Sequence, residues 1–194
     1  MLLNPSVGIS SREKELELTT RLDYYTLEHR LTIFGDIMVD QDLIKNFIWE
    51  STKETFETMI FLPVEKADGQ DNSATSASLI CTITFTGQIQ GTFSILCGLE
   101  GVEKIARAML MIEGDDPMEV PDICDAFGEL TNMVIGGIKI RMNDTTPDIQ
   151  ISIPSVTKGL EIQPILSKGM ARIDVTAKAD GQAMKMAMMY KSQS

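Results

Sequence analysis

Residues 121–138 read PDICDAFGELTNMVIGGI, and this stretch decides the fold of the chain. Its large apolar residues recur three or four positions apart, which predicts an α-helix over residues 121–142 with one buried face. The residues on that face are Ile123, Phe127, Leu130, Val134 and Ile138. Pro121 suits the first turn of such a helix, and the polar residues before Pro147 predict its end.

The opposite side of this helix carries a stripe of a different kind. At 3.6 residues per turn, Asp125, Glu129, Asn132 and Gly136 lie within about 60° of one another. Gly136 has no Cβ, so another surface could approach the stripe closely there. A polar stripe opposite an apolar one is typical of any solvated helix, and the spacing alone favours that plain interpretation.

The elements around this helix follow from the same kind of pattern. Leu43, Phe47, Phe56 and Met59 predict an earlier helix that begins near residue 40 and stops before Pro63. Later segments are predicted as a hairpin (77–85 and 92–97), a helix (101–112), a strand (149–153) and a second hairpin (171–177 and 183–190).

This order of elements predicts an internal duplication, because each half has a long helix followed by a hairpin with Gly-Gln at its turn. We therefore expect an α/β (α+β) domain over residues 40–194. In this domain we expect duplicated helix–β-hairpin units, whose long helices pack on an antiparallel sheet. Residues 1–39 are expected to form an N-terminal extension, either a short docked helix or a disordered tail.

Composition excludes several classes of function. The chain of 194 residues carries a net charge of −11, which argues against a general binder of nucleic acid or of acidic membranes. The three cysteines, Cys81, Cys97 and Cys124, form no CxxC pair and indicate no metal site. Reduced thiols, the lack of a signal peptide and the lack of a long apolar segment favour a cytoplasmic protein without membrane insertion.

The stripe resembles the signature of a known family. Asp125, then Glu129-x-x-Asn132, then Gly136 and a later Pro154 are similar to the pattern of the CheC/CheX/FliY phosphatases. The likeness extends over about residues 40–191, because the helix–hairpin units have the same order in that family. The resemblance implies a CheC-like fold. It also implies hydrolysis of the aspartyl phosphate on the receiver domain of a CheY-like response regulator in chemotaxis.

The resemblance also implies roles for the stripe. Asn132 would orient the attacking water, because an amide both donates and accepts hydrogen bonds. Glu129 would pair with the receiver's lysine. Asp125, Gly136 and Pro154 would contact the partner. No cofactor is expected on this chain, and Mg²⁺ is expected on the phosphorylated receiver.

The first half of the chain departs from the signature. Aligning the two long helices places Asn46, Glu50 and Lys53 against Asp125, Glu129 and Asn132, so a lysine stands where the amide is needed. One site per chain is therefore expected, as in the CheX branch of the family.

The resemblance further implies a homodimer, for which the strand over residues 183–190 would serve as a contact or would simply pack in the core. The alternatives to an enzyme are a non-catalytic module that binds receivers and a dimeric scaffold.

Overall fold

The computed structural model of the chain describes residues 31–34, 37–67, 79–114, 117–160, 162 and 164–192. The chain divides into two compact units, of which one ends at Asp42 and the other begins at Leu43. The first unit contains an antiparallel hairpin of β1 (Leu31–Phe34) and β2 (Ile37–Asp40), which the sequence did not predict. The helix or tail was expected over residues 1–39, and residues 1–30 of that segment lie outside the described residues.

The remaining elements alternate helices with strands. In chain order they are α2 (Gln41–Thr55), the π-helical turn η1 (Phe56–Ile60), β3 (Val64–Lys66), β4 (Leu79–Thr86), β5 (Ile89–Cys97), α3 (Leu99–Met109), α4 (Val120–Met142), β6 (Gln150–Ile151), β7 (Ser155–Lys158), β8 (Ala171–Ala179) and β9 (Gln182–Ser192). Both long helices and both hairpins were predicted. The short strands β3 and β7 were not predicted, and β6 is shorter than the strand expected over residues 149–153.

The second unit is built on an antiparallel sheet of seven strands in the order β3-β8-β9-β5-β4-β6, with β7 also pairing with β4. The two hairpins meet in the middle, where β5 pairs with β9 so that Phe93 lies opposite Met188. The short β3 extends the second hairpin, whereas β6 and β7 extend the first. This strand order is symmetric about the central pair, and the duplication itself stays a prediction.

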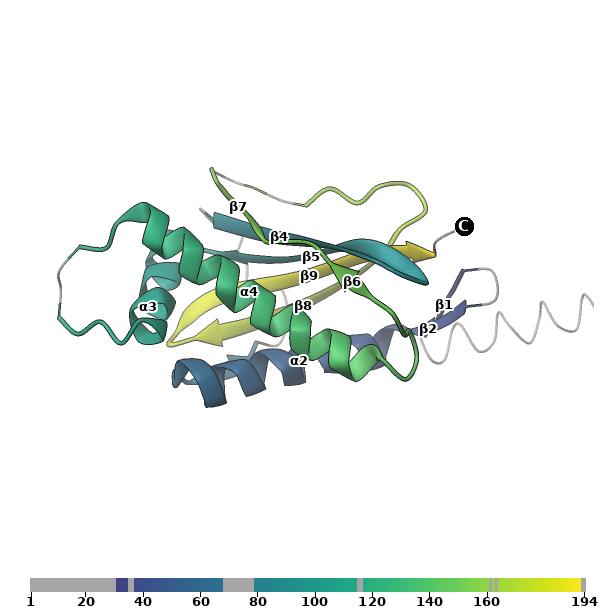
Figure 1. Cartoon of the computed structure of the whole chain (residues 1–194), viewed down its shortest axis with the longest axis horizontal. Coiled ribbons are helices and arrows are strands. Elements are labelled where there is room, and N and C mark those ends of the chain that lie inside the picture. The colour runs from purple at the N-terminus through teal and green to yellow at the C-terminus, as the bar shows by residue number, and fades with distance from the viewer. Residues whose placement is uncertain are drawn as a thin grey trace, which may run out of the picture. The chain divides into compact units, whose positions relative to one another are not determined.

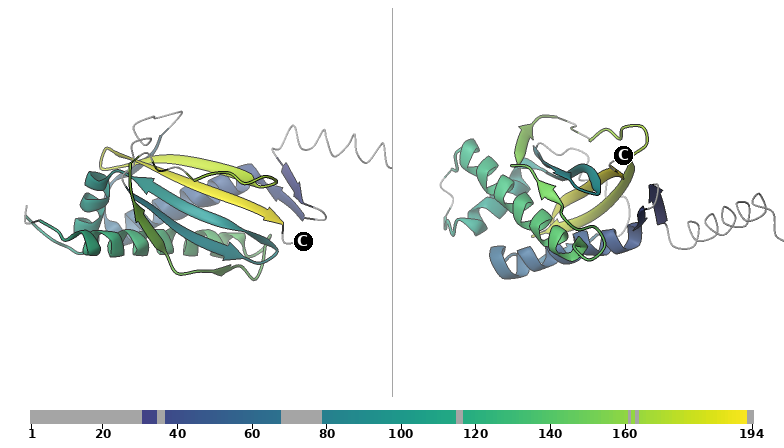
Figure 2. Two further views of the ribbon diagram at one scale, coloured as in Figure 1. Left: turned by 90° about the horizontal axis from the view of Figure 1, so that it is seen from above. Right: turned by 45° about the vertical axis from the view of Figure 1, so that its right-hand side comes forward.

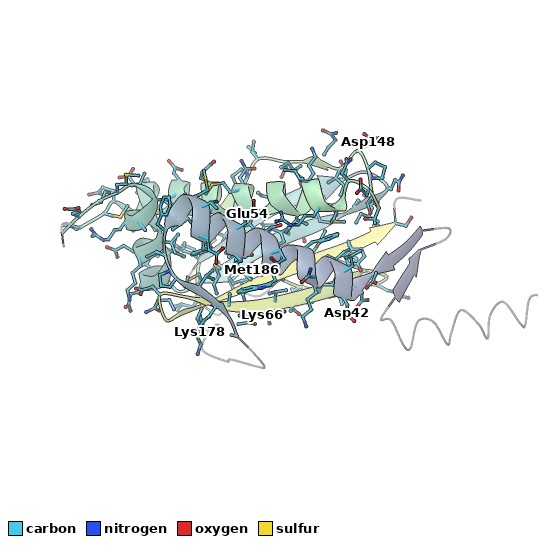
Figure 3. All side chains as sticks on the ribbon, turned by 90° about the horizontal axis from the view of Figure 1, so that it is seen from below. Asp42, Glu54, Lys66, Asp148, Lys178 and Met186 are labelled. Carbon is cyan, nitrogen blue, oxygen red and sulfur yellow. The ribbon has the colours of Figure 1, made fainter. Side chains whose placement is uncertain are left out.

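The helices cover one face of this sheet, as Figures 1 and 2 show. The face is made of fully buried side chains such as Phe93, Ile95 and Met186, the last of which is labelled in Figure 3. On the other face, Ile162 packs against Ile80 and Leu96. The sheet is therefore the centre of the core, and α4 lies along it with one side turned outward.

The position of β9 decides one open question. Strand β9 is hydrogen-bonded to neighbours on both sides, and Met184, Met186, Met188 and Tyr190 are all buried. These methionines therefore pack in the core of the chain, as one of the two alternatives expected, and the homodimer stays a prediction.

Candidate functional site

Helix α4 begins and ends where its sequence predicts. Pro121 lies in its first turn together with Asp122, and Lys139 and Arg141 lie in its last turn, which matches the charge preference of helix ends. The side chains predicted for its inner face are buried, with Phe127, Leu130, Val134 and Ile138 all at 0% exposure. Helix α4 also contacts α3, β4, β5 and β7, so its orientation is fixed along its length.

The predicted stripe faces outward. Asp125 and Glu129 are exposed, while Asn132 and Gly136 are half-buried. Glu129 and Asn132 are separated by a rise of about 4.5 Å along the helix axis, which is less than one turn. A carboxylate and a side-chain amide are thus presented together on a rigid element.

Pro154 lies beside this stripe although it is distant in sequence. A Cβ added to Gly128 would lie 3.3 Å from Cγ of Pro154, so the proline ring packs directly on the helix next to Glu129. The segment before Pro154 is fastened to β4, because the Thr84 amide donates to Ser152 Oγ at 3.0 Å and the Ser152 amide donates to Thr84 O at 2.9 Å. Ile153 lies between Ser152 and Pro154 in the chain and is 87% exposed.

The two adjacent glycines of α4 have different surroundings. A Cβ on Gly137 would lie 3.0 Å from Cβ of Ser51 on α2, so Gly137 permits the close approach of the two helices. A Cβ on Gly136 would meet nothing within 4 Å. No internal contact of the described residues therefore accounts for a glycine at position 136.

A groove of about 740 Å³ runs along the C-terminal half of α4, between α4 and the end of α2 with η1. Its lining includes Gly136, Met133 and Ile140 from α4 and Thr58 and Met59 from the opposite side. The sequence did not predict this groove. The sequence feature that could have indicated the groove is the pair of adjacent glycines in α4, because small residues in a helix allow another surface to come close.

Charged side chains hold the walls of the groove together. Arg141 forms an ion pair with Glu54 of α2, and its Nη1 donates to the Gly137 carbonyl at 3.2 Å. Glu54 is labelled in Figure 3, at the boundary between the two helices. The groove is thus bounded by helices that are joined by a close backbone approach and by an ion pair.

The two buried thiols, Cys81 and Cys97, lie on strands β4 and β5 of the sheet. Burial raises the pKa of the Cys81 thiol, and a hydrogen bond with Thr131 of α4 opposes that effect in part. Burial raises the pKa of the Cys97 thiol to about 12. Thiols with raised pKa values are poor nucleophiles, so these two cysteines are structural.

The first long helix differs at the aligned positions. Lys53 of α2 lies 3.9 Å from Glu57 in an exposed ion pair. Among the described residues, no group of three His, Cys, Asp or Glu side chains converges to hold a metal ion. Within the same part of the chain, no helix is both long and apolar enough to cross a membrane.

The comparison with solved structures defines the class of protein. CheX from Vibrio vulnificus superposes with a TM-score of 0.64 at 21% identity, covering 76% of this chain and 96% of that one. CheX from Desulfovibrio desulfuricans gives a TM-score of 0.65 at 21% identity, covering 76% and 99%. A chain of the CheX–CheY–BeF3–Mg complex from Borrelia burgdorferi gives a TM-score of 0.61 at 15% identity, covering 76% of this chain and 97% of that one. The fold is therefore that of CheX and its CheC-like relatives, as the sequence predicted.

The sequence itself identifies the family. The family described as chemotaxis phosphatase CheX matches residues 79–177, just over half of the chain. No curated protein matches the sequence. The chain belongs to the CheX family of chemotaxis phosphatases. The roles assigned to Asp125, Glu129, Asn132, Gly136 and Pro154 stay predictions.

Proposed function

We propose that this chain hydrolyses the aspartyl phosphate on the receiver domain of a CheY-like response regulator. The observation that carries the proposal is the presentation of Glu129 and Asn132 on one outward stripe of α4, with Pro154 packed beside them. Membership of a family of chemotaxis phosphatases supports the same activity. A receiver-containing partner and a cytoplasmic location belong to this proposal.

The reaction requires the enzyme to position a water molecule and little else. An acyl phosphate is already reactive, so catalysis requires a water molecule held in line with the bond that breaks. The water oxygen forms a bond to phosphorus while the bond from phosphorus to the aspartyl oxygen breaks, which releases inorganic phosphate and a free carboxylate. Asn132 holds the water, because its amide can accept a hydrogen bond from it and donate one to the phosphoryl group.

Glu129 sets the position of the partner. Its carboxylate pairs with the receiver's lysine, and such a charge-assisted contact fixes both distance and direction. Asp125 adds a second negative charge on the same exposed side of the helix, while Gly136 and Pro154 complete the contact surface. The Mg²⁺ that neutralises phosphoryl charge belongs to the receiver.

The test is the rate of phosphate loss from phosphorylated receivers encoded in the same genome. Wild-type protein should accelerate the loss, and Asn132→Ala should reduce that acceleration by about 100-fold or more. Glu129→Lys should abolish it by repelling the receiver's lysine. Asn143→Ala is the matched control, because it removes an exposed amide at the end of the same helix, and it should retain full activity.

The outcomes separate the enzyme from its alternatives. If receivers bind to the chain but lose phosphate no faster, the chain would be a non-catalytic receiver-binding module. If Asn132→Ala were as active as the Asn143→Ala control, the assigned mechanism would be wrong. We also expect a homodimer, which sedimentation of the wild type would reveal.

A further inference from the structure

The groove beside α4 has exposed apolar side chains on both walls, and polar side chains such as Glu54, Thr55 and Thr58 complete the wall opposite α4. Met59 from η1 is 60% exposed and Ile140 from α4 is 76% exposed, and Met133 also contributes to the lining. Exposed apolar side chains facing one another across a groove are typical of a surface that a partner covers. Methionine side chains suit such a surface because they adapt to different shapes.

A local departure from α-helical geometry builds one wall. The chain changes from α2 to the π-helical turn η1 at Phe56, and the turn closes with the Phe61 amide donating to the Phe56 carbonyl at 2.8 Å. Phe61 itself has a φ of 60°, which is strained for an aromatic residue. The wider turn rotates Met59 away from the core, and π-helical turns of this kind occur frequently at functional sites.

The groove is continuous with the catalytic stripe. Gly136 belongs to both, and it lies about 6 Å further along the helix axis than Asn132. Specific complexes bury about 800 Å² on each partner and transient signalling complexes somewhat less, which is still more than a stripe of four residues can offer. A receiver seated on Glu129 and Asn132 therefore has to extend beyond the stripe, and Gly136 presents no side chain to block its extension over the groove.

We propose that the groove takes an apolar side chain from the same receiver whose phosphoaspartate Asn132 acts upon. This inference rests on the proposed function and extends it, because it assigns receiver binding to the groove and phosphate hydrolysis to the stripe with Glu129 and Asn132. The occupant is the receiver, since a second copy of this chain seated in the groove would cover Asn132 and prevent the reaction. The groove thus fixes the receiver at the C-terminal half of α4, while Ile153 flanks its N-terminal half.

The test measures binding separately from turnover. A receiver carrying beryllofluoride and Mg²⁺, which mimics the phosphorylated form, is titrated with wild-type protein, Ile140→Glu, Asn132→Ala and Ile165→Glu. Ile165 is the matched control, because it is 86% exposed and undergoes the same change on the segment before β8. Ile140→Glu should raise Kd at least tenfold, with phosphate loss near the wild-type rate once saturated. Asn132→Ala should bind normally and fail to turn over, and Ile165→Glu should behave as wild type.

Each outcome decides a different point. Equal Kd values for Ile140→Glu and Ile165→Glu would overturn the role of the groove. Wild-type binding without faster phosphate loss would reject the catalytic function, yet Ile140→Glu would still decide whether the groove binds the receiver. No binding by the wild type would reject both. Conversion of a dimer to a monomer by Ile140→Glu, with receiver affinity unchanged, would assign the groove to self-association and overturn the inference.

Discussion

Gly136 and Gly137 are adjacent in α4, and the same substitution should have different effects at the two positions. A Cβ on Gly136 meets nothing within 4 Å, so Gly136→Ala should gain only the helix propensity of alanine, about 0.5–1 kcal/mol. A Cβ on Gly137 would lie 3.0 Å from Cβ and 3.1 Å from Oγ of the buried Ser51. Ser51 Cβ is attached to the α2 backbone, so the two helices would have to move apart.

The magnitude follows from the difference between the variants. Overpacking of a buried contact costs about 1–3 kcal/mol. Both variants gain the same propensity term, so that term cancels when they are compared with each other. The free energy of unfolding of Gly137→Ala should therefore lie about 1–3 kcal/mol below that of Gly136→Ala.

Urea unfolding monitored by circular dichroism measures this difference. With a slope of about 2 kcal/mol/M, the two midpoints should differ by about 0.5–1.5 M, with Gly136→Ala above the wild type. Two variants with the same midpoint would refute the contact assigned to Gly137 and the open space assigned to Gly136. The more stable Gly136→Ala should not bind the receiver more tightly, because the added methyl group stands on the docking surface.

Further predictions concern other residues that support the site. Burial raises the pKa of the Cys97 thiol from 9.0 to about 12, so unfolding releases its proton above pH 9. The stabilisation from the protonated thiol is therefore complete below pH 9, and the free energy of unfolding falls by about 1.4 kcal/mol per pH unit between pH 9 and pH 12. Urea unfolding at pH 8 and pH 10 should show this fall in the wild type and a smaller one in Cys97→Ala. Gly128→Ala should press on Pro154, 3.3 Å away, and reduce phosphatase activity more than thermal stability. Arg141→Met should lose up to about 1 kcal/mol of unfolding free energy with the Glu54 ion pair and should weaken receiver binding in titrations.

The sequence predicted α4 well because local signals agreed there. Three signals predict the same helix: the proline at its N-terminus, the polar residues that end it, and the apolar residues spaced three or four apart. The structure describes this helix as Val120–Met142. The outward stripe then follows from helical geometry alone. A pattern repeated over several turns is difficult for tertiary contacts to override.

The groove could not be predicted in this way. The helical period that placed Met59 on a buried face assumes a constant rotation per residue, and the π-helical turn η1 adds a residue to one turn. Met59 therefore faces outward. The predicted buried face was also wrong earlier in α2, because the helix buries Ile44 and Ile48 and leaves Leu43 exposed. The strands β3 and β7 were missed for a related reason, because each is short and pairs with a hairpin from the other half of the chain.

The two long helices explain why one face of this chain is specialised. The alignment that places Lys53 against Asn132 also places Glu57 against Gly136 in sequence, although Glu57 lies in the π-helical turn η1 that follows α2. Lys53 at the end of α2 and Glu57 of η1 form an exposed ion pair. On α4 the two aligned positions hold an amide and a bare length of backbone. A lysine offers only donors and a glutamate adds bulk, so α2 can neither orient a water molecule nor admit a partner closely. Under the proposed function we therefore expect the amide and the glycine to act together, with Asn132 orienting the water molecule and Gly136 leaving room for the partner.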